Sequence, residues 1–180
     1  METLEKGLVA GITEIGDRWI REEAFLTEVL LSANAMRYGL KIIEKEMEKA
    51  GKTRESLGKV IIGTVEGDIH NLGKNIVAAL LIAAGFEVYD IGIDVPTEKF
   101  VETIKEIKPD VLGLSSLMTI TIPEQRKVIE ALNRAGLRDR VKVIVGGAPV
   151  TEEWAEEIGA DAYGRDALDA VKKVKELLGV

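Results

Sequence analysis

The chain contains no cysteine among its 180 residues, which excludes disulfide bonds, thiolate metal sites and cysteine nucleophiles. It also contains a single histidine, and a lone histidine makes a poor zinc site, because zinc generally takes three or four protein ligands. Aromatic residues make up only 4% of the chain, although apolar residues make up 46%. The interior must therefore be built from valine, isoleucine, leucine and alanine, a composition typical of α/β proteins.

Long apolar runs and an excess of basic residues are missing as well. No stretch approaches the ~20 apolar residues of a membrane span, and the N-terminal sequence lacks the apolar core of a signal peptide. The formal net charge of −7 argues against a nucleic-acid or anionic-membrane partner, since both require a basic face. We therefore expect a cytoplasmic protein with neither kind of partner.

The first 50 residues show helical spacing of apolar residues in two successive stripes. The break between the two helices falls in the polar segment 21–24, and Thr27 is a candidate N-cap for the second helix. The next segment is charged, aperiodic and flanked by glycine, which is typical of a linker. We expect a helical cap over residues 1–50, a linker over 51–58 and a second domain over 59–180.

Beyond the linker, short β-branched runs alternate with amphipathic helices. The expected strands are 59–65, 86–92, 110–115, 141–147 and 160–164, and the expected helices are 73–84, 97–107, 122–136, 151–159 and 166–178. Thr97 and Thr151 are expected N-caps, and Pro123 is an expected first-turn residue. Strands that are apolar throughout must be covered by helices on both faces. This predicts an α/β fold with a five-stranded, doubly wound parallel sheet, flavodoxin-like or Rossmann-like, and an N-terminal helical cap.

Ligands of such sheets bind beyond the carboxyl ends of the strands, and the first loop at that edge holds the only histidine. In this loop, EGDIHNLGKN, His70 follows Asp68 by two residues. In an extended loop both side chains can point the same way, so the carboxylate can accept one ring N–H and make the other ring nitrogen a better donor. The alternative is that Asp68 caps the following helix and His70 is a surface loop residue.

Two common phosphate-dependent sites do not fit these loops. A P-loop needs four residues between its glycines and a serine or threonine after its lysine, whereas five residues separate Gly67 from Gly73, and Asn75 follows the lysine. A response regulator needs an acceptor aspartate at the end of the third strand. The chain has Ser115 and Ser116 there.

Two further loops carry unusual chemistry. The second, SSLMTITIP, places Ser115, Ser116, Thr119 and Thr121 where the third expected strand ends, although the hydroxyls could also serve only to cap the next helix. The third, GGAPV, has two adjacent glycines that would let a ligand lie against the backbone.

Together the three loops resemble the cobalamin-binding domain family. Its pattern is D-x-H-x-x-G, then S-x-L, then G-G, and the chain has these elements at 68–73, 115–117 and 146–147, with the spacing of the family. Upstream, residues 16–47 are similar to the helical cap of methyl-carrying corrinoid proteins and of the cobalamin module of methionine synthase. The resemblance thus covers nearly the whole chain.

The resemblance implies a role for each matching residue. His70 would be the lower axial ligand of cobalt in place of the cofactor's own benzimidazole, Asp68 would hold its ring, and Thr121 would extend the proton relay. The further implied cofactor contacts are Gly67, Ile69, Asn71, Gly73, Ser115, Leu117, Thr119, Gly146, Gly147 and Ala167. Phe25, Leu26, Val29 and Leu30 are candidates to cover the upper face of the corrin, although their spacing is equally typical of helix-on-helix packing.

The function implied is that of a corrinoid protein that binds cobalamin base-off and His-on. It would shuttle a methyl group on cobalt between a methyl-donor methyltransferase and an acceptor methyltransferase, as a carrier component and not a complete enzyme. A reductive activase would be a further partner. The family cap normally has four helices, whereas only two precede the linker, so either the sequence begins late or another subunit completes the bundle, for example in a homo-oligomer.

Three alternatives remain open at this point. The small subunit of a carbon-skeleton mutase shares the histidine loop and the α/β fold but would not need the N-terminal helices. A cobalamin-based sensor usually carries an output domain. The third alternative is a structural α/β domain with an empty site.

Overall fold

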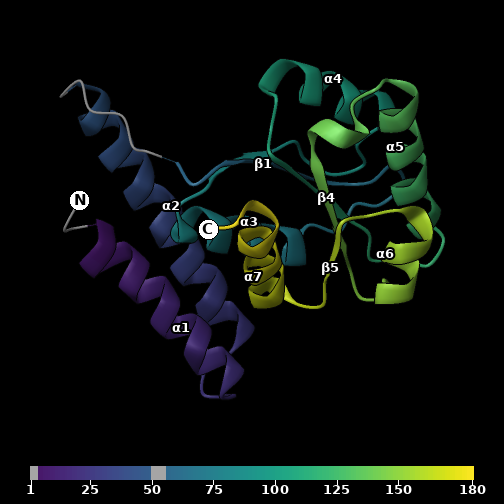
Figure 1. Ribbon diagram of the computed structural model, residues 1–180. Helices are drawn as coiled ribbons and strands as arrows, with labels where there is room; N and C mark the ends of the chain where they lie inside the picture. The colour runs from purple at the N-terminus through teal and green to yellow at the C-terminus, as the bar shows by residue number, and fades with distance from the viewer. Residues whose placement is uncertain (1–3, 50–55) are drawn as a thin grey trace.

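The computed structural model describes residues 4–49 and 56–180, and its centre is one parallel sheet (Figure 1). The strands are β1 (Lys59–Thr64), β2 (Glu87–Asp90), β3 (Val111–Ser115), β4 (Lys142–Gly146) and β5 (Ala162–Gly164). They lie in the order β2-β1-β3-β4-β5, and each neighbouring pair is parallel. This is the flavodoxin-like order, which reverses between β1 and β3 and leaves a crevice at their carboxyl ends. The fold predicted from the sequence is confirmed.

Helices cover both faces of this sheet (Figure 1). One face carries α4 (Thr97–Ile107), α5 (Ile122–Arg134) and α6 (Glu152–Ile158), and the other carries α3 (Leu72–Ala84) and α7 (Ala167–Leu178). Neighbouring residues of β1 pack against opposite helix layers. Ile61 belongs to the buried cluster that contains Phe100 of α4, whereas Val60 belongs to the cluster that contains Leu81 of α3. None of these four residues is more than 1% exposed. A short 3-10 helix, Arg138–Arg140, precedes β4.

The strand at the sheet edge is shorter than predicted, with three residues in β5 instead of the five expected over 160–164. The Asp161 carboxylate accepts the Val143 N–H at 2.7 Å, while the Asp161 N–H donates to the Val143 carbonyl at 2.8 Å. A side chain therefore takes the place of a backbone acceptor, and regular pairing begins only at Ala162.

Two of the predicted helix starts are confirmed. The Thr151 hydroxyl accepts the Trp154 N–H at 3.2 Å and caps α6. Pro123 lies in the first turn of α5, as its fixed φ favours.

Two predicted N-caps are wrong by one or two residues. Thr97 is the first residue of α4, because Pro96 has the extended backbone of the cap position. Thr27 lies inside α2 (Leu26–Lys49), because the Phe25 carbonyl accepts the Glu28 N–H and the Glu28 carboxylate accepts the Phe25 N–H. This reciprocal pairing resembles a capping box in which the Phe25 carbonyl takes the place of the side-chain acceptor.

The N-terminal segment forms the two predicted helices, which run side by side as a hairpin (Figure 1). A π-helical turn, Leu4–Val9, leads into α1 (Ala10–Ile20), and α2 follows after the turn. Ile76 and Leu80 of α3 belong to one buried cluster with Val29 and Met36 of α2. Leu81 of α3 belongs to the cluster on the sheet side. The helix α3 is apolar on two sides because it lies between the sheet and the hairpin.

Within residues 4–49 and 56–180, no helix combines the length and apolar character needed to cross a membrane. The division into cap, linker and α/β domain stays a prediction. Most of the predicted linker, residues 51–55, lies outside the described residues.

Candidate functional site

A buried carboxylate joins the first two loops at the carboxyl edge of the sheet. Asp68 is fully buried, and its Oδ1 accepts the His70 N–H at 3.0 Å and approaches His70 Nδ1 to 2.8 Å. Its Oδ2 accepts the N–H groups of Leu117 and Met118 at 2.7 and 3.2 Å and the Thr121 hydroxyl at 3.0 Å. Asp68 therefore holds the histidine with one oxygen and the second loop with the other.

These contacts keep Asp68 ionised. Burial by itself would raise its pKa, but the backbone N–H groups of His70 and Leu117, the His70 ring and the Thr121 hydroxyl outweigh burial and lower the pKa from 3.8 to about 2. At neutral pH the carboxylate is a charged acceptor, and a charge-assisted hydrogen bond to the His70 ring is stronger than a neutral one.

The His70 ring is fixed at one nitrogen and open at the other. Because Nδ1 donates to the carboxylate, Nε2 keeps its lone pair in the neutral ring. The His70 side chain is 47% exposed, and its carbonyl accepts the hydroxyl of the buried Thr64 at 3.0 Å, which fixes the loop backbone. This arrangement suits coordination of a metal that approaches from the surface.

The alternative that Asp68 caps the next helix is wrong. Asn71 occupies the N-cap position of α3 and forms no side-chain cap hydrogen bond, and the Asp68 carboxylate points to the second loop. The hydroxyl of Thr121 does not cap α5 either, since it binds Asp68 and the Met118 carbonyl. Both polar loops therefore direct their side chains toward each other.

The network includes a residue that the sequence motifs did not identify, Ser116. The Ser116 hydroxyl is fully buried and lies 2.8 Å from Thr121 Oγ1, which extends the chain of hydroxyls behind Asp68. Ser115, the predicted contact, is half-buried at the end of β3, and Thr119 is exposed. The alternation of side chains along a strand means that only one of two adjacent serines can reach this network. This alternation is the sequence signal that distinguishes Ser116 from Ser115.

The two glycines of the third loop are explained by close packing. A Cβ on Gly147 would lie 1.7 Å from the Ser116 carbonyl oxygen, and the φ of Gly147 is +135°. A Cβ on Gly146 would lie 3.1 Å from the Gly164 carbonyl oxygen. At Gly73, in contrast, a Cβ would meet no atom within 4 Å, so the first turn of α3 borders open space. Of these three predicted contacts, only Gly73 has room beside it.

The other predicted contacts lie at different depths. Ile69 is 68% exposed and Leu117 is 43% exposed, and the apolar Ile120 in the same loop as Leu117 is 79% exposed. Gly67 and Asn71 are exposed in the first loop. Ala167 is buried at the start of α7, in the cluster that includes α3 residues. The two hydrogen-bonded loops thus present an apolar surface beside His70.

Of the four predicted cap residues, the two whose side chains the structure describes, Phe25 and Val29, differ in exposure. Val29 is 1% exposed in the cluster between α2 and α3, whereas Phe25 is 79% exposed in the hairpin turn. The side chains of Leu26 and Leu30 lie outside the described part of the chain.

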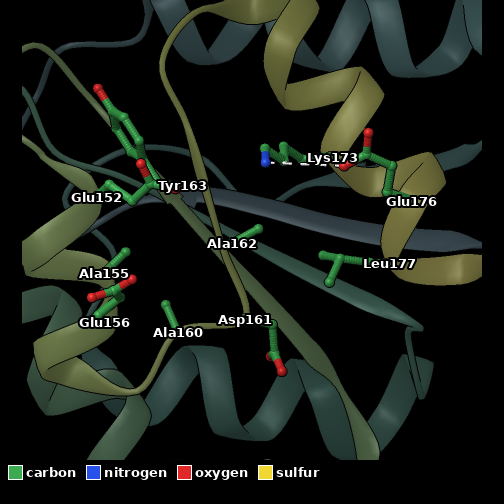
Figure 2. Close-up of a pocket in the computed structure, with 10 residues that line it drawn as sticks. All are labelled: Glu152, Ala155, Glu156, Ala160, Asp161, Ala162, Tyr163, Lys173, Glu176 and Leu177. Atoms are coloured by element: carbon green, nitrogen blue, oxygen red, sulfur yellow. Dashed lines mark ion pairs between the residues drawn. The ribbon is translucent and has the colours of Figure 1, made fainter.

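A pocket of about 270 Å³ lies elsewhere, where α6, β5 and α7 meet at the sheet edge (Figure 2). It is lined by Glu152, Ala155, Glu156, Ala160, Asp161, Ala162, Tyr163, Lys173, Glu176 and Leu177. Its one lysine pairs with Glu176 at 4.0 Å. No residue of the three loops lines it.

Two segments of the chain match known family models. Residues 58–172 match the family model described as B12 binding domain, and residues 1–44 match a second model with the same description. The chain belongs to the B12-binding corrinoid protein family. Its cofactor is a corrinoid.

Curated relatives of this corrinoid protein are similar over its full length. The trimethylamine corrinoid protein of Methanosarcina barkeri is 53% identical over 180 residues, which are 100% of this chain and 83% of that protein. The dimethylamine corrinoid protein 2 of Methanosarcina acetivorans is 52% identical over 98% of this chain and 82% of that protein.

Solved structures of known proteins also superpose on the chain. A chain of the methanol:cobalamin methyltransferase complex from Methanosarcina barkeri superposes with a TM-score of 0.86 at 31% identity, covering 99% of this chain and 67% of its own. The monomethylamine corrinoid protein of the same organism gives a TM-score of 0.66 at 37% identity, covering 98% of this chain and 82% of its own. A response-regulator receiver domain from Mycobacterium tuberculosis, at 22% identity and a TM-score of 0.51 over 69% of this chain, shares the fold alone.

The donor set of the corrinoid protein fits its cofactor. No cluster of three histidine, cysteine, aspartate or glutamate side chains that could hold a metal occurs in residues 4–49 and 56–180. A metal bound at His70 must therefore bring its other ligands with it, as cobalt does in a corrin ring. The open side of Gly73 and the exposed Ile69 and Leu117 leave room and apolar surface for such a ring.

The charge on Asp68 predicts that the protein without cofactor loses stability in acid. The pKa of Asp68 in the folded state, about 2, lies below its ordinary 3.8, so the stabilisation is complete above pH ~4 and is lost as the pH falls toward 2. The loss should be about 2 kcal/mol. It is measured as the difference in unfolding free energy between the native protein and Asp68→Asn in urea, which should shrink between pH 6 and pH 2.5. A difference that does not change with pH would contradict this assignment.

Proposed function

We propose that this protein binds cobalamin base-off and His-on and carries a methyl group between a methyl-donor methyltransferase and an acceptor methyltransferase. When bound, a corrinoid would supply the cobalt chemistry for methyl transfer between these partners. The observation that carries the proposal is the 2.8 Å contact between His70 Nδ1 and the buried Asp68, which leaves Nε2 open toward the surface.

The protein's own residues control the ring of His70. The ionised Asp68 fixes the tautomer and raises the basicity of Nε2, and the Thr121 hydroxyl, with Ser116 behind it, holds the far oxygen of Asp68 in place.

The donor is a methylamine in this proposal. Relatives named for trimethylamine and dimethylamine are 50–53% identical to the chain, whereas the chain from the methanol system is 31% identical. The hairpin of α1 and α2, which a mutase subunit would not need, also favours methyl transfer over the mutase alternative.

We further propose that the hairpin shields the cofactor and moves aside for partners. Figure 1 shows the turn between α1 and α2 at the same end of the molecule as the loop that leads into α7, which is the carboxyl edge of the sheet. Phe25 projects from this turn and is 79% exposed. Its large apolar side chain is therefore available to cover a cofactor.

The test is a reconstitution with defined partners. The protein is loaded with hydroxocobalamin, reduced, and mixed separately with methyltransferases specific for trimethylamine, dimethylamine and methanol, each with its substrate. Methyl transfer to cobalt is followed by absorbance. We expect transfer with an amine-specific enzyme and none without an enzyme. Transfer with none of the three enzymes, or with the methanol enzyme alone, would contradict the proposal.

A further inference from the structure

A residue of the loop after β2 is bonded to the backbone just before His70. Asp94 Oδ1 accepts the Gly67 N–H at 2.7 Å, and the Asp94 N–H donates to the Asp68 carbonyl at 2.9 Å. The φ of Asp94 is +50°, a backbone conformation that residues other than glycine adopt rarely, with aspartate and asparagine among the more tolerant. Such a conformation persists where surrounding bonds hold it, and here both bonds go to the histidine loop.

The two bonds fix the turn from which Asp68 projects. The Asp68 N–H donates to the Val65 carbonyl at 3.2 Å, so residues 65–68 form a tight turn, and Gly67 within it has φ +78°. Gly67 has the left-handed backbone within this turn, and its N–H donates to the Asp94 carboxylate. The Asp68 carboxylate is held from one side by the second loop, and its backbone is held from the other side by Asp94.

The loop that carries Asp94 is itself anchored at its start. Lys74, in the first turn of α3, is 4% exposed and forms an ion pair with Asp90 at the end of β2. The Asp90 carboxylate also accepts the Gly92 N–H at 2.9 Å. The segment 90–94 is therefore bound to the chain on both sides of His70, by Asp94 before the histidine and by Asp90 after it.

We propose that Asp94 is a positioning residue for His70. It acts through Gly67 and Asp68, and it sets the direction of the His70 ring without contacting the cofactor. A ligand must be held within a few tenths of an ångström to coordinate well, so loss of this clamp weakens the bond of His70 to cobalt. The inference rests on the proposed role of His70 as the axial ligand.

Three variants separate the side-chain bond from the backbone conformation. Asp94→Gly removes the acceptor but suits a positive φ, whereas Asp94→Asn keeps an acceptor oxygen and tolerates the same φ. Lys108→Gly is the matched control, because Lys108 has φ +52° at the end of α4 and belongs to none of the three loops. Each variant is made with His70 present and with His70→Ala, and its unfolding curve is recorded.

The measured quantities are the Kd for hydroxocobalamin and the fraction of Co(II) protein whose EPR lines are split by a histidine nitrogen. With His70 present, Asp94→Gly should bind about tenfold more weakly and show a smaller coupled fraction. Asp94→Asn and Lys108→Gly should stay within about twofold of the native protein. In the His70→Ala background, Asp94→Gly should have no further effect on Kd, because the residue acts through the histidine.

The inference is overturned if Asp94→Gly binds like the native protein, or if it weakens binding equally with and without His70. The second result would indicate a general effect on the pocket. Failure of the proposed function looks different, because His70→Ala itself would then bind cobalamin as tightly as the native protein, and the role of Asp94 would fall with it.

Discussion

Replacing His70 by alanine is expected to weaken cobalamin binding on the order of a hundredfold while the protein stays folded. The variant loses the nitrogen that would coordinate cobalt. The fold should survive because the His70 side chain is 47% exposed, and Asp68 keeps its hydrogen bonds to Leu117, Met118 and Thr121. The affinity is measured by absorbance titration with hydroxocobalamin, together with a urea unfolding curve.

The matched control for this substitution is Glu66→Gln. Glu66 is an exposed residue at the start of the same loop, and it belongs to no hydrogen bond of the Asp68 network. Its replacement should change the affinity by less than about twofold, as expected for a surface position. Native affinity in His70→Ala, with a normal unfolding curve, would exclude the histidine as an important ligand.

Replacing Gly147 by alanine is expected to destabilise the fold by about 3 kcal/mol or more. The new Cβ would lie 1.7 Å from the Ser116 carbonyl oxygen, and alanine strongly disfavours a φ of +135°. Ser116 cannot move away freely, because its N–H donates to the Gly146 carbonyl at 3.1 Å and its hydroxyl contacts Thr121. The substitution should lower the urea midpoint of unfolding.

Gly73→Ala provides the contrast. Its Cβ would meet no protein atom, and alanine in the first turn of α3 favours helix, so stability should be unchanged or higher by up to about 1 kcal/mol. If Gly147→Ala unfolded at the same urea concentration as Gly73→Ala, the packing of the third loop on the second would be wrong.

The sequence predicted the layers of the fold because its strands leave little choice. The runs that form β1 and β3 are apolar on both sides, and only a sheet covered on two faces can bury them. The ends of elements were harder to predict. At β5 the Asp161 side chain replaces a backbone partner, and at α2 the Phe25 carbonyl serves where a threonine was expected. Such substitutions depend on the position of a neighbouring chain segment, which spacing does not reveal.

The site was predictable where its residues are close in the sequence. The pair of Asp68 and His70 follows from their spacing, and their contact is found at 2.8 Å. Asp94 was missed because its contacts join separate loops, whereas Ser116 contacts Thr121 within its own loop and is distinguished from Ser115 only by the alternation of side chains along the strand. Asp94 reaches Gly67 across 27 residues, and only the placement of β2 beside β1 brings the two together.

The central claim, that His70 coordinates cobalt, is tested most directly by isotope labelling, because the chain has one histidine. Protein grown on nitrogen-15 histidine is loaded with cobalamin, reduced to Co(II) and examined by EPR, in which an axial nitrogen splits each cobalt line. Nitrogen-14 gives triplets and nitrogen-15 gives doublets. If His70 is the ligand, the label converts triplets to doublets. Triplets that persist in the labelled protein would show that the cofactor's own base remains on cobalt and would contradict the account.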